Sequence, residues 1–139
     1  DLKGIGVYLH WNGGRDSVEG VLTYCKIKGY RPPEYDNYGW AYLCTTIGNF
    51  FGQSGLSLGV DVANKLDCDN WDNGTYIIKD WKIVDRLYKR RREQAVYPLM
   101  DMLLSIDEKQ PEPLGEDAIR AALEKIKQEE TADDDSAAS

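Results

Sequence analysis

The chain has 139 residues, of which 42% are hydrophobic and 29% charged, as expected for one globular domain with its own core. No apolar run approaches the roughly 20 residues that cross a bilayer, and no N-terminal pattern marks a signal peptide, so we predict neither. The net charge of −7 is uneven: residues 1–100 hold 13 Lys and Arg against 12 Asp and Glu, and residues 101–139 hold 4 against 12. The acidity therefore belongs to the C-terminal part.

The N-terminal segment predicts a strand followed by a helix. Residues 4–11 are rich in β-branched and aromatic side chains and favour a strand, which an Asn-Gly-Gly turn ends at residues 12–14. Asp16 or Ser17 is then the expected N-cap of a helix. With Asp16 as N-cap, Glu19 takes the reciprocal position of a capping box.

The middle of the chain alternates between the two patterns. Apolar side chains on one stripe predict a helix over 40–51, and strict alternation predicts a strand over 56–62. Two short strand-like runs follow at 75–78 and 81–84. Asp-Asn-Gly at 72–74 is a strong hairpin-turn signal.

The C-terminal part is predicted to be helical. Residues 85–105 show helical spacing, which Pro98 could interrupt. Residues 107–115 predict a linker that acts as a hinge. Residues 116–130 predict an amphipathic helix whose apolar side docks on this domain or across a dimer, and its acidic face could lie against the basic run at 89–92.

These elements predict an α+β fold, with a small mixed or antiparallel sheet packed against two to four helices. The expected organisation is a globular domain over 1–106, the linker, the C-terminal helix, and a disordered acidic tail over 131–139.

The Gly-Gly loop between the first strand and helix is the most specific local motif. Glycines let backbone approach a ligand closely, and the first helix amides together with a nearby arginine form a cradle for phosphate. The segment resembles the pyrophosphate-binding loop of the PP-loop ATP pyrophosphatases, Ser-Gly-Gly-x-Asp-Ser, with Asn replacing the first Ser. Alternatively, it is a turn into a well-capped helix. The predicted ligand-binding residues, including three aromatic residues, are Trp11, Asn12, Gly13, Gly14, Arg15, Asp16, Ser17, Tyr38 and Trp40.

Aromatic and charged clusters allow two interpretations each. Nine Tyr, four Trp and two Phe could stack a base or complete a small core and a protein interface. Asp67, Asp69 and Asp72 could hold a divalent cation, but Trp71 breaks the EF-hand pattern from Asp69, so a turn is favoured and no metal is predicted. Lys89 begins four consecutive cations, which could contact phosphates or an acidic partner or form a solvated face.

Catalytic signatures are sparse. His10 is the only histidine, and no Ser-His-Asp, HExxH or Walker pattern occurs. Cys25 and Cys44 are expected as buried thiols, with Cys68 the candidate for a reactive one. We predict no catalytic residues and no cofactor, although a Cys-His pair formed by tertiary contact is not detectable from the sequence.

The runs GVYLHWNGGRDSVEGVLTYCKIKGY, YGWAYLCTTIGNFFG and DNWDNGTYIIKDWKIV are similar to small uncharacterised proteins of phages and conjugative elements of Gram-positive bacteria, over residues 3–88. The resemblance implies a counter-defence role in the host cytoplasm. We expect a non-catalytic binding protein that sequesters a nucleotide-type signal or inhibits a bacterial immune protein. The alternative is a small nucleotide-processing enzyme that uses the Gly-Gly loop. Direct DNA binding is not favoured, and a homo-oligomer is compatible with the sequence.

Overall fold

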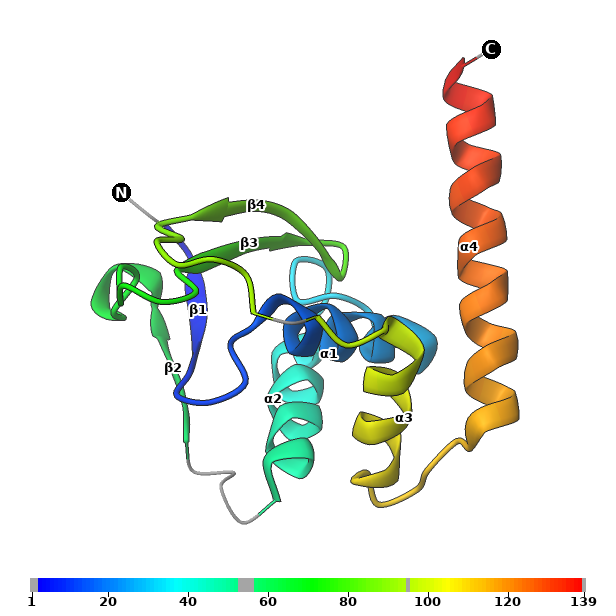
Figure 1. Ribbon diagram of the computed structural model, residues 1–139, viewed down its shortest axis with the longest axis horizontal. Coiled ribbons are helices and arrows are strands. Elements are labelled where there is room, and N and C mark those ends of the chain that lie inside the picture. The colour runs from blue at the N-terminus through cyan, green and yellow to red at the C-terminus, as the bar shows by residue number, and fades with distance from the viewer. Residues whose placement is uncertain (1–2, 53–56, 95, 139) are drawn as a thin grey trace.

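The computed structural model describes residues 3–52, 57–94 and 96–138, with side chains up to residue 132. In this part of the chain four α-helices accompany two small antiparallel sheets of two strands each, which confirms the α+β prediction. Figure 1 shows the sheets on one side of the molecule and the C-terminal helix on the other. None of the described helices combines the length and apolar character that a membrane crossing needs.

The first sheet pairs β1 (Ile5–Leu9) with β2 (Leu58–Val62). Both strands were expected, and the start of the predicted second strand at residue 56 lies outside the described residues. The two strands are far apart in sequence, so the chain forms α1 and α2 before it returns to pair with β1. A short 3-10 helix, η2 (Ala63–Lys65), follows β2.

The second sheet is a hairpin of β3 (Thr75–Lys79) and β4 (Lys82–Leu87). Its turn is formed by Asp80 and Trp81, whose φ angles of 53° and 60° match a type I′ turn. The prediction of a hairpin turn at 72–74 is therefore wrong, because the strands before and after this segment do not pair with each other: β2 pairs with β1 and β3 with β4. Gly74 instead lies against the backbone of 87–89, where its φ of 74° suits glycine.

Three helices form the body of the molecule. They are α1 (Arg15–Ile27), α2 (Tyr38–Phe51) and α3 (Leu99–Glu108). Gly20 brings α1 close to α3, since a Cβ at this position would lie 2.4 Å from Met102 Cγ. The main core cluster consists of Val21, Tyr24, Ile47, Met102, Leu103, Ile106, Ile119 and Leu123.

The helix predicted over 85–105 is wrong in its first half. Residues 85–87 belong to β4, where pairing with β3 outweighs the local helical spacing. Pro98 does not interrupt the helix but forms the N-cap of α3, a place that proline tolerates because the first helical N–H groups have no internal partner.

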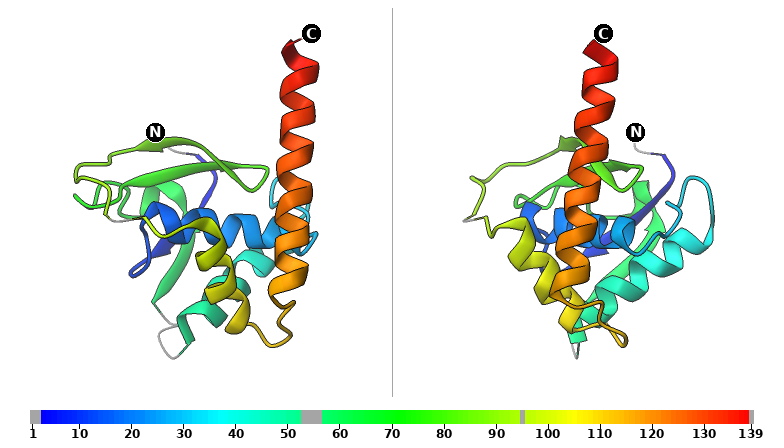
Figure 2. Two further views of the ribbon diagram at one scale, coloured as in Figure 1. Left: turned by 45° about the vertical axis from the view of Figure 1, so that its right-hand side comes forward. Right: turned by 90° about the vertical axis from the view of Figure 1, so that its right-hand side faces the viewer.

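The C-terminal helix α4 (Glu116–Ala138) is longer than the 116–130 segment we predicted. The structure describes the helix as far as residue 138, and disorder of the acidic tail over 131–139 stays a prediction. Ile119 and Leu123 are buried in the main core, so α4 docks on its own chain. Its last turns extend beyond the rest of the molecule (Figures 1 and 2).

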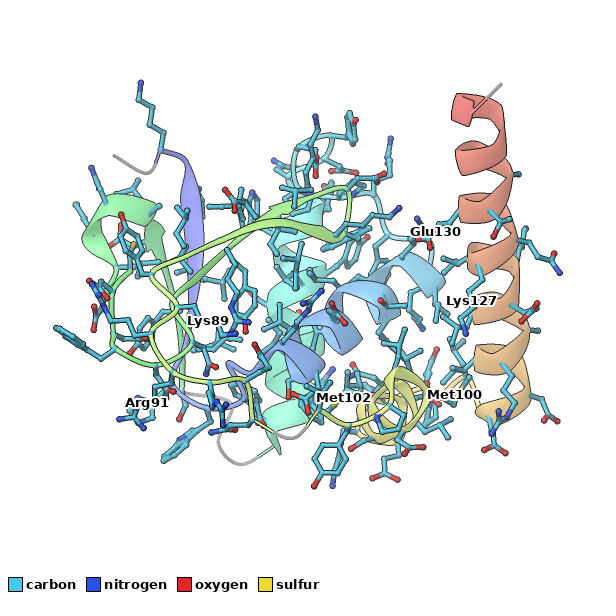
Figure 3. The ribbon with its side chains drawn as sticks, turned by 45° about the horizontal axis from the view of Figure 1, so that its top comes forward. Lys89, Arg91, Met100, Met102, Lys127 and Glu130 are labelled. Atoms are coloured by element: carbon cyan, nitrogen blue, oxygen red, sulfur yellow. The ribbon has the colours of Figure 1, made fainter. Side chains whose placement is uncertain are left out.

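The expected contact between the acidic face of α4 and the basic run is not present among the described side chains. Glu130 instead pairs with Lys82 at 3.2 Å, and Figure 3 shows Glu130 on the side of α4 that faces the body. The basic run follows β4 on the far side of the molecule in Figure 1. Distance therefore prevents the predicted contact within one chain.

Candidate functional site

The Gly-Gly loop enters α1 without a side-chain cap. Gly14 is the N-cap, with an extended backbone (φ −68°, ψ 156°), and its carbonyl accepts a hydrogen bond from Val18 N at 3.1 Å. Asp16 and Ser17 were the predicted N-caps, and both predictions are wrong because the helix has already begun at Arg15. The Asp16 carboxylate instead accepts hydrogen bonds from the amides of Ser17 (2.7 Å) and Tyr97 (3.2 Å).

The charges around the first turn of α1 do not favour an anion. Arg15 donates to the Glu19 carboxylate at 2.7 Å, and this hydrogen bond raises the pKa of the arginine. The predicted capping-box role of Glu19 is therefore replaced by an ion pair. A phosphate at these amides would face the carboxylates of Asp16 and Glu19, and Arg15 is already paired with Glu19.

The Gly-Gly loop is also held by residues of and before β3. The Tyr76 hydroxyl donates to the Gly13 carbonyl at 2.8 Å, and a Cβ on Gly13 would lie 3.4 Å from Asn73 Nδ2. Burial raises the pKa of Tyr76 to about 12, so its hydroxyl stays a donor. The loop is thus fixed on strand β3. Two shallow hollows found in the described residues lie elsewhere, one along α4 and one beside Ile5 and Val62.

The predicted site residues lie at two separate places. Trp11, Asn12 and the loop glycines precede α1, whereas Tyr38 and Trp40 belong to the first turn of α2, beyond the other end of α1. The 13 residues of α1 span about 20 Å at 1.5 Å per residue. Gly39 fixes this placement, because a Cβ there would come within 2.7 Å of the backbone of 31–33.

Three loops meet around the N-terminal end of α1, and we call them together the loop surface. The first loop is 10–14 and the second is 67–74. The third connects β4 to α3, and its described residues are 88–94 and 96–97. Arg90 joins two of them: its guanidinium bonds both Asp69 carboxylate oxygens, at 2.9 and 2.6 Å, and lies 4.5 Å from the centre of the Trp71 ring. The bond from Arg90 lowers the pKa of Asp69.

Large aromatic side chains are exposed on the loop surface. The exposed fractions are 59% for Trp11, 67% for Trp71, 46% for Tyr88 and 66% for Tyr97. Asn12, Trp71 and Tyr88 adopt positive φ angles of 56°, 64° and 62°. Such a conformation is uncommon for a residue other than glycine and is unfavourable for a bulky one.

Three aromatic residues of this surface were not predicted from the sequence: Trp71, Tyr88 and Tyr97. Trp71 was considered only as the residue that breaks a calcium-loop pattern, and nothing in the sequence indicated the left-handed backbone. The basic run at 89–92 was the one available signal, and the structure places it beside these aromatics. Figure 3 shows Arg91 pointing away from the body.

The remaining candidate groups are not assembled into a reactive site within the described residues. Burial raises the pKa of Cys25 to about 12, which keeps this thiol protonated. Cys68 donates to the Ala63 carbonyl at 3.2 Å. The described part of the chain holds no group of three His, Cys, Asp or Glu side chains able to bind a metal, and Asp69 is engaged by Arg90.

Comparison with models of protein families, with curated proteins and with solved structures returned no match.

Proposed function

We propose that this chain is a non-catalytic binding protein that docks onto another protein through the loop surface. The observation that carries the proposal is that Trp71, which contacts Arg90, and Tyr88 are both exposed aromatic residues held in a left-handed backbone conformation. A strained conformation persists only where the surrounding structure imposes it, and such strain concentrates at functional sites.

The chemistry of the loop surface suits a protein partner. Trp, Tyr and Arg are the residue types that contribute most at protein interfaces, and here they are presented by loops on a helical body. Arg90 is paired with Asp69 and Lys89 with Glu93, whereas Arg91 and Arg92 form no ion pair with any described carboxylate. We therefore expect carboxylates on the facing surface of the partner.

The nature of the partner follows from the sequence resemblance. Similarity to small proteins of phages and conjugative elements supports an immune protein of the bacterial host as the target, with inhibition as the consequence of docking. A docked aromatic surface buries the apolar area that a stable complex requires.

A nucleotide-type ligand at the Gly-Gly loop stays a separate prediction. The Asp16 carboxylate and the Arg15–Glu19 pair weaken the support for it. A rise in melting temperature with linear or cyclic nucleotides would favour this ligand. Recovery of unchanged nucleotide after incubation with Mg²⁺ would exclude the enzyme alternative.

The experiment that tests the docking proposal is site-specific photo-crosslinking in a bacterial host. A photoreactive phenylalanine analogue replaces Trp71 or Tyr88 in the full chain, and Tyr35 serves as the matched control. Tyr35 is 72% exposed but precedes α2 at the other end of α1. We expect one common adduct from positions 71 and 88, absent from position 35 and reduced by Arg91→Ala with Arg92→Ala. Adducts from position 35 alone, or equal adducts at all three, would contradict the proposal.

A further inference from the structure

Arg86 occupies a central position beneath the loop surface. It lies on β4 directly opposite Tyr76 on β3, and its side chain is only 14% exposed. A buried arginine requires charge and hydrogen-bond partners to offset the loss of water. The partners of Arg86 come from each of the three loops, either directly or through Tyr76.

The contacts of Arg86 are of three kinds. Nε donates to the carbonyl of Asn73 at 3.2 Å, which holds the 67–74 loop. Nη1 donates to the Glu93 carboxylate, which holds the segment 88–94. The guanidinium lies 4.5 Å from the centre of the Tyr76 ring, and the hydroxyl of this tyrosine holds Gly13 in the third loop.

We infer that Arg86 is the positioning residue of the loop surface, which fixes three separate loops in the one arrangement that presents Trp11, Trp71 and Tyr88 together. This inference rests on the proposed docking function, because it explains how an exposed binding surface is kept ordered without a partner. Preorganisation of this kind lowers the conformational entropy that binding would otherwise cost.

Two features support this role over that of a simple surface ion pair. The charged hydrogen bond from Arg86 lowers the pKa of Glu93 to about 2, with a further contribution from Lys89. The carboxylate therefore stays charged at any physiological pH. The geometry is also specific to arginine, because a flat guanidinium can stack on a ring and donate in two directions at once, whereas a lysine ammonium cannot.

The test is amide hydrogen exchange on the free full-length protein, followed segment by segment. For Arg86→Met we expect exchange to accelerate by about tenfold in all three loops, the order of effect of losing a charged hydrogen bond. Peptides from α1 and α3 should be unchanged. Arg92→Met is the matched control, since it removes one exposed cation from the same segment and should leave all three loops as protected as in the original protein.

Two further variants keep the test decisive if Arg86→Met does not fold. Arg86→Lys should keep 88–94 protected through Glu93 but release 67–74, because the donor to Asn73 is lost. Tyr76→Phe should release only 10–14. Acceleration confined to 88–94 in both Arg86 variants, or acceleration in α1 and α3 equal to that in the loops, would overturn the inference.

The yield of the crosslinked adduct at position 71 distinguishes a positioning role of Arg86 from a purely structural one. Arg86→Met should lower the adduct yield several-fold although Tyr88, Arg91 and Arg92 are all retained, whereas Arg86→Lys should lower it less. An unchanged yield with the Met variant would overturn the positioning role. If the original protein forms no adduct at position 71, the docking proposal fails, while the exchange measurements still decide what Arg86 does.

Discussion

Replacing Asp107 by Asn should destabilise the protein by about 2 kcal/mol, because this residue connects α1, α3 and the start of α4. Asp107 is 4% exposed. Its carboxylate accepts the Tyr24 hydroxyl at 2.7 Å and the amides of Leu114 and Gly115 at 2.8 and 2.9 Å. The Asp107 side chain therefore links the first residue of the predicted hinge at 107–115 to its last two residues by hydrogen bonds.

The magnitude follows from which donors lose an acceptor. An asparagine keeps one oxygen for Tyr24 and Leu114 but directs an NH₂ group at the Gly115 amide, so one hydrogen bond to a charged group is lost. Such bonds contribute about 1.5–3 kcal/mol. Tyr24→Phe removes a single donor and should cost less, about 1 kcal/mol, since both backbone amides keep the carboxylate.

The contribution of the Asp107 charge can be recognised from the pH dependence of the free energy of unfolding. Burial alone would raise the pKa of this carboxyl, but hydrogen bonds from Tyr24 and the two amides outweigh burial and lower it below 3.8. With a lowered pKa in the folded state, the unfolded chain binds the extra proton first. The stabilisation is therefore fully present above about pH 4 and declines as pH falls below that value.

Urea unfolding at pH 7 and pH 3 measures both effects. Asp101→Asn is the control, because it makes the same chemical change at an exposed position of α3. We expect the difference between the two variants to shrink at pH 3. Equal stabilities of the two variants at pH 7, or a gap that does not change with pH, would refute the reasoning.

Three further changes test other parts of the fold. Glu93→Gln should lower the free energy of unfolding by about 1 kcal/mol at pH 7, given the partial exposure of Glu93. Because the pKa of Glu93 is about 2 in the folded state, this difference from the original protein should fade between pH 4.5 and about 2. A pH series of melting temperatures measures it. Trp81→Ala should cost about 4 kcal/mol in chemical unfolding, since the indole is 4% exposed; a loss under 1 kcal/mol would contradict this packing. Gly20→Ala should destabilise by about 2 kcal/mol through its clash with Met102, whereas Gly48→Ala, with nothing within 4 Å, should stabilise α2 by up to about 1 kcal/mol in the same assay.

The helical body could be predicted from the sequence because helical burial is periodic. Val21, Leu22 and Cys25 have the i, i+1, i+4 spacing of one helix face in α1, and all three are buried. Strands β3 and β4 were placed within a few residues by their β-branched and aromatic composition, whereas their pairing into a hairpin was not predicted. These patterns are local, so neighbouring residues suffice to reveal them.

The errors occurred where a distant contact decides the outcome. Residues 85–87 fall in a segment with helical spacing of its apolar residues, yet cross-strand pairing with β3, as between Arg86 and Tyr76, places them in β4. Asp16 has the side chain of an N-cap, but the backbone of Gly14 begins the helix first. The loop surface could not be predicted for the same reason, since its loops are distant in sequence and meet only through side chains such as Arg86 and Arg90.

The main core and the exposed aromatic residues of the loop surface occupy different parts of the molecule. The buried residues of α1, α3 and α4 form one core, which Asp107 closes at the α4 side. Trp71 and Tyr88 remain exposed on the loop surface, where Arg86 and Arg90 hold their loops. Because the core already supplies burial on folding, these aromatics are not required to complete it. Their exposed area is therefore available to a partner, as the docking proposal requires.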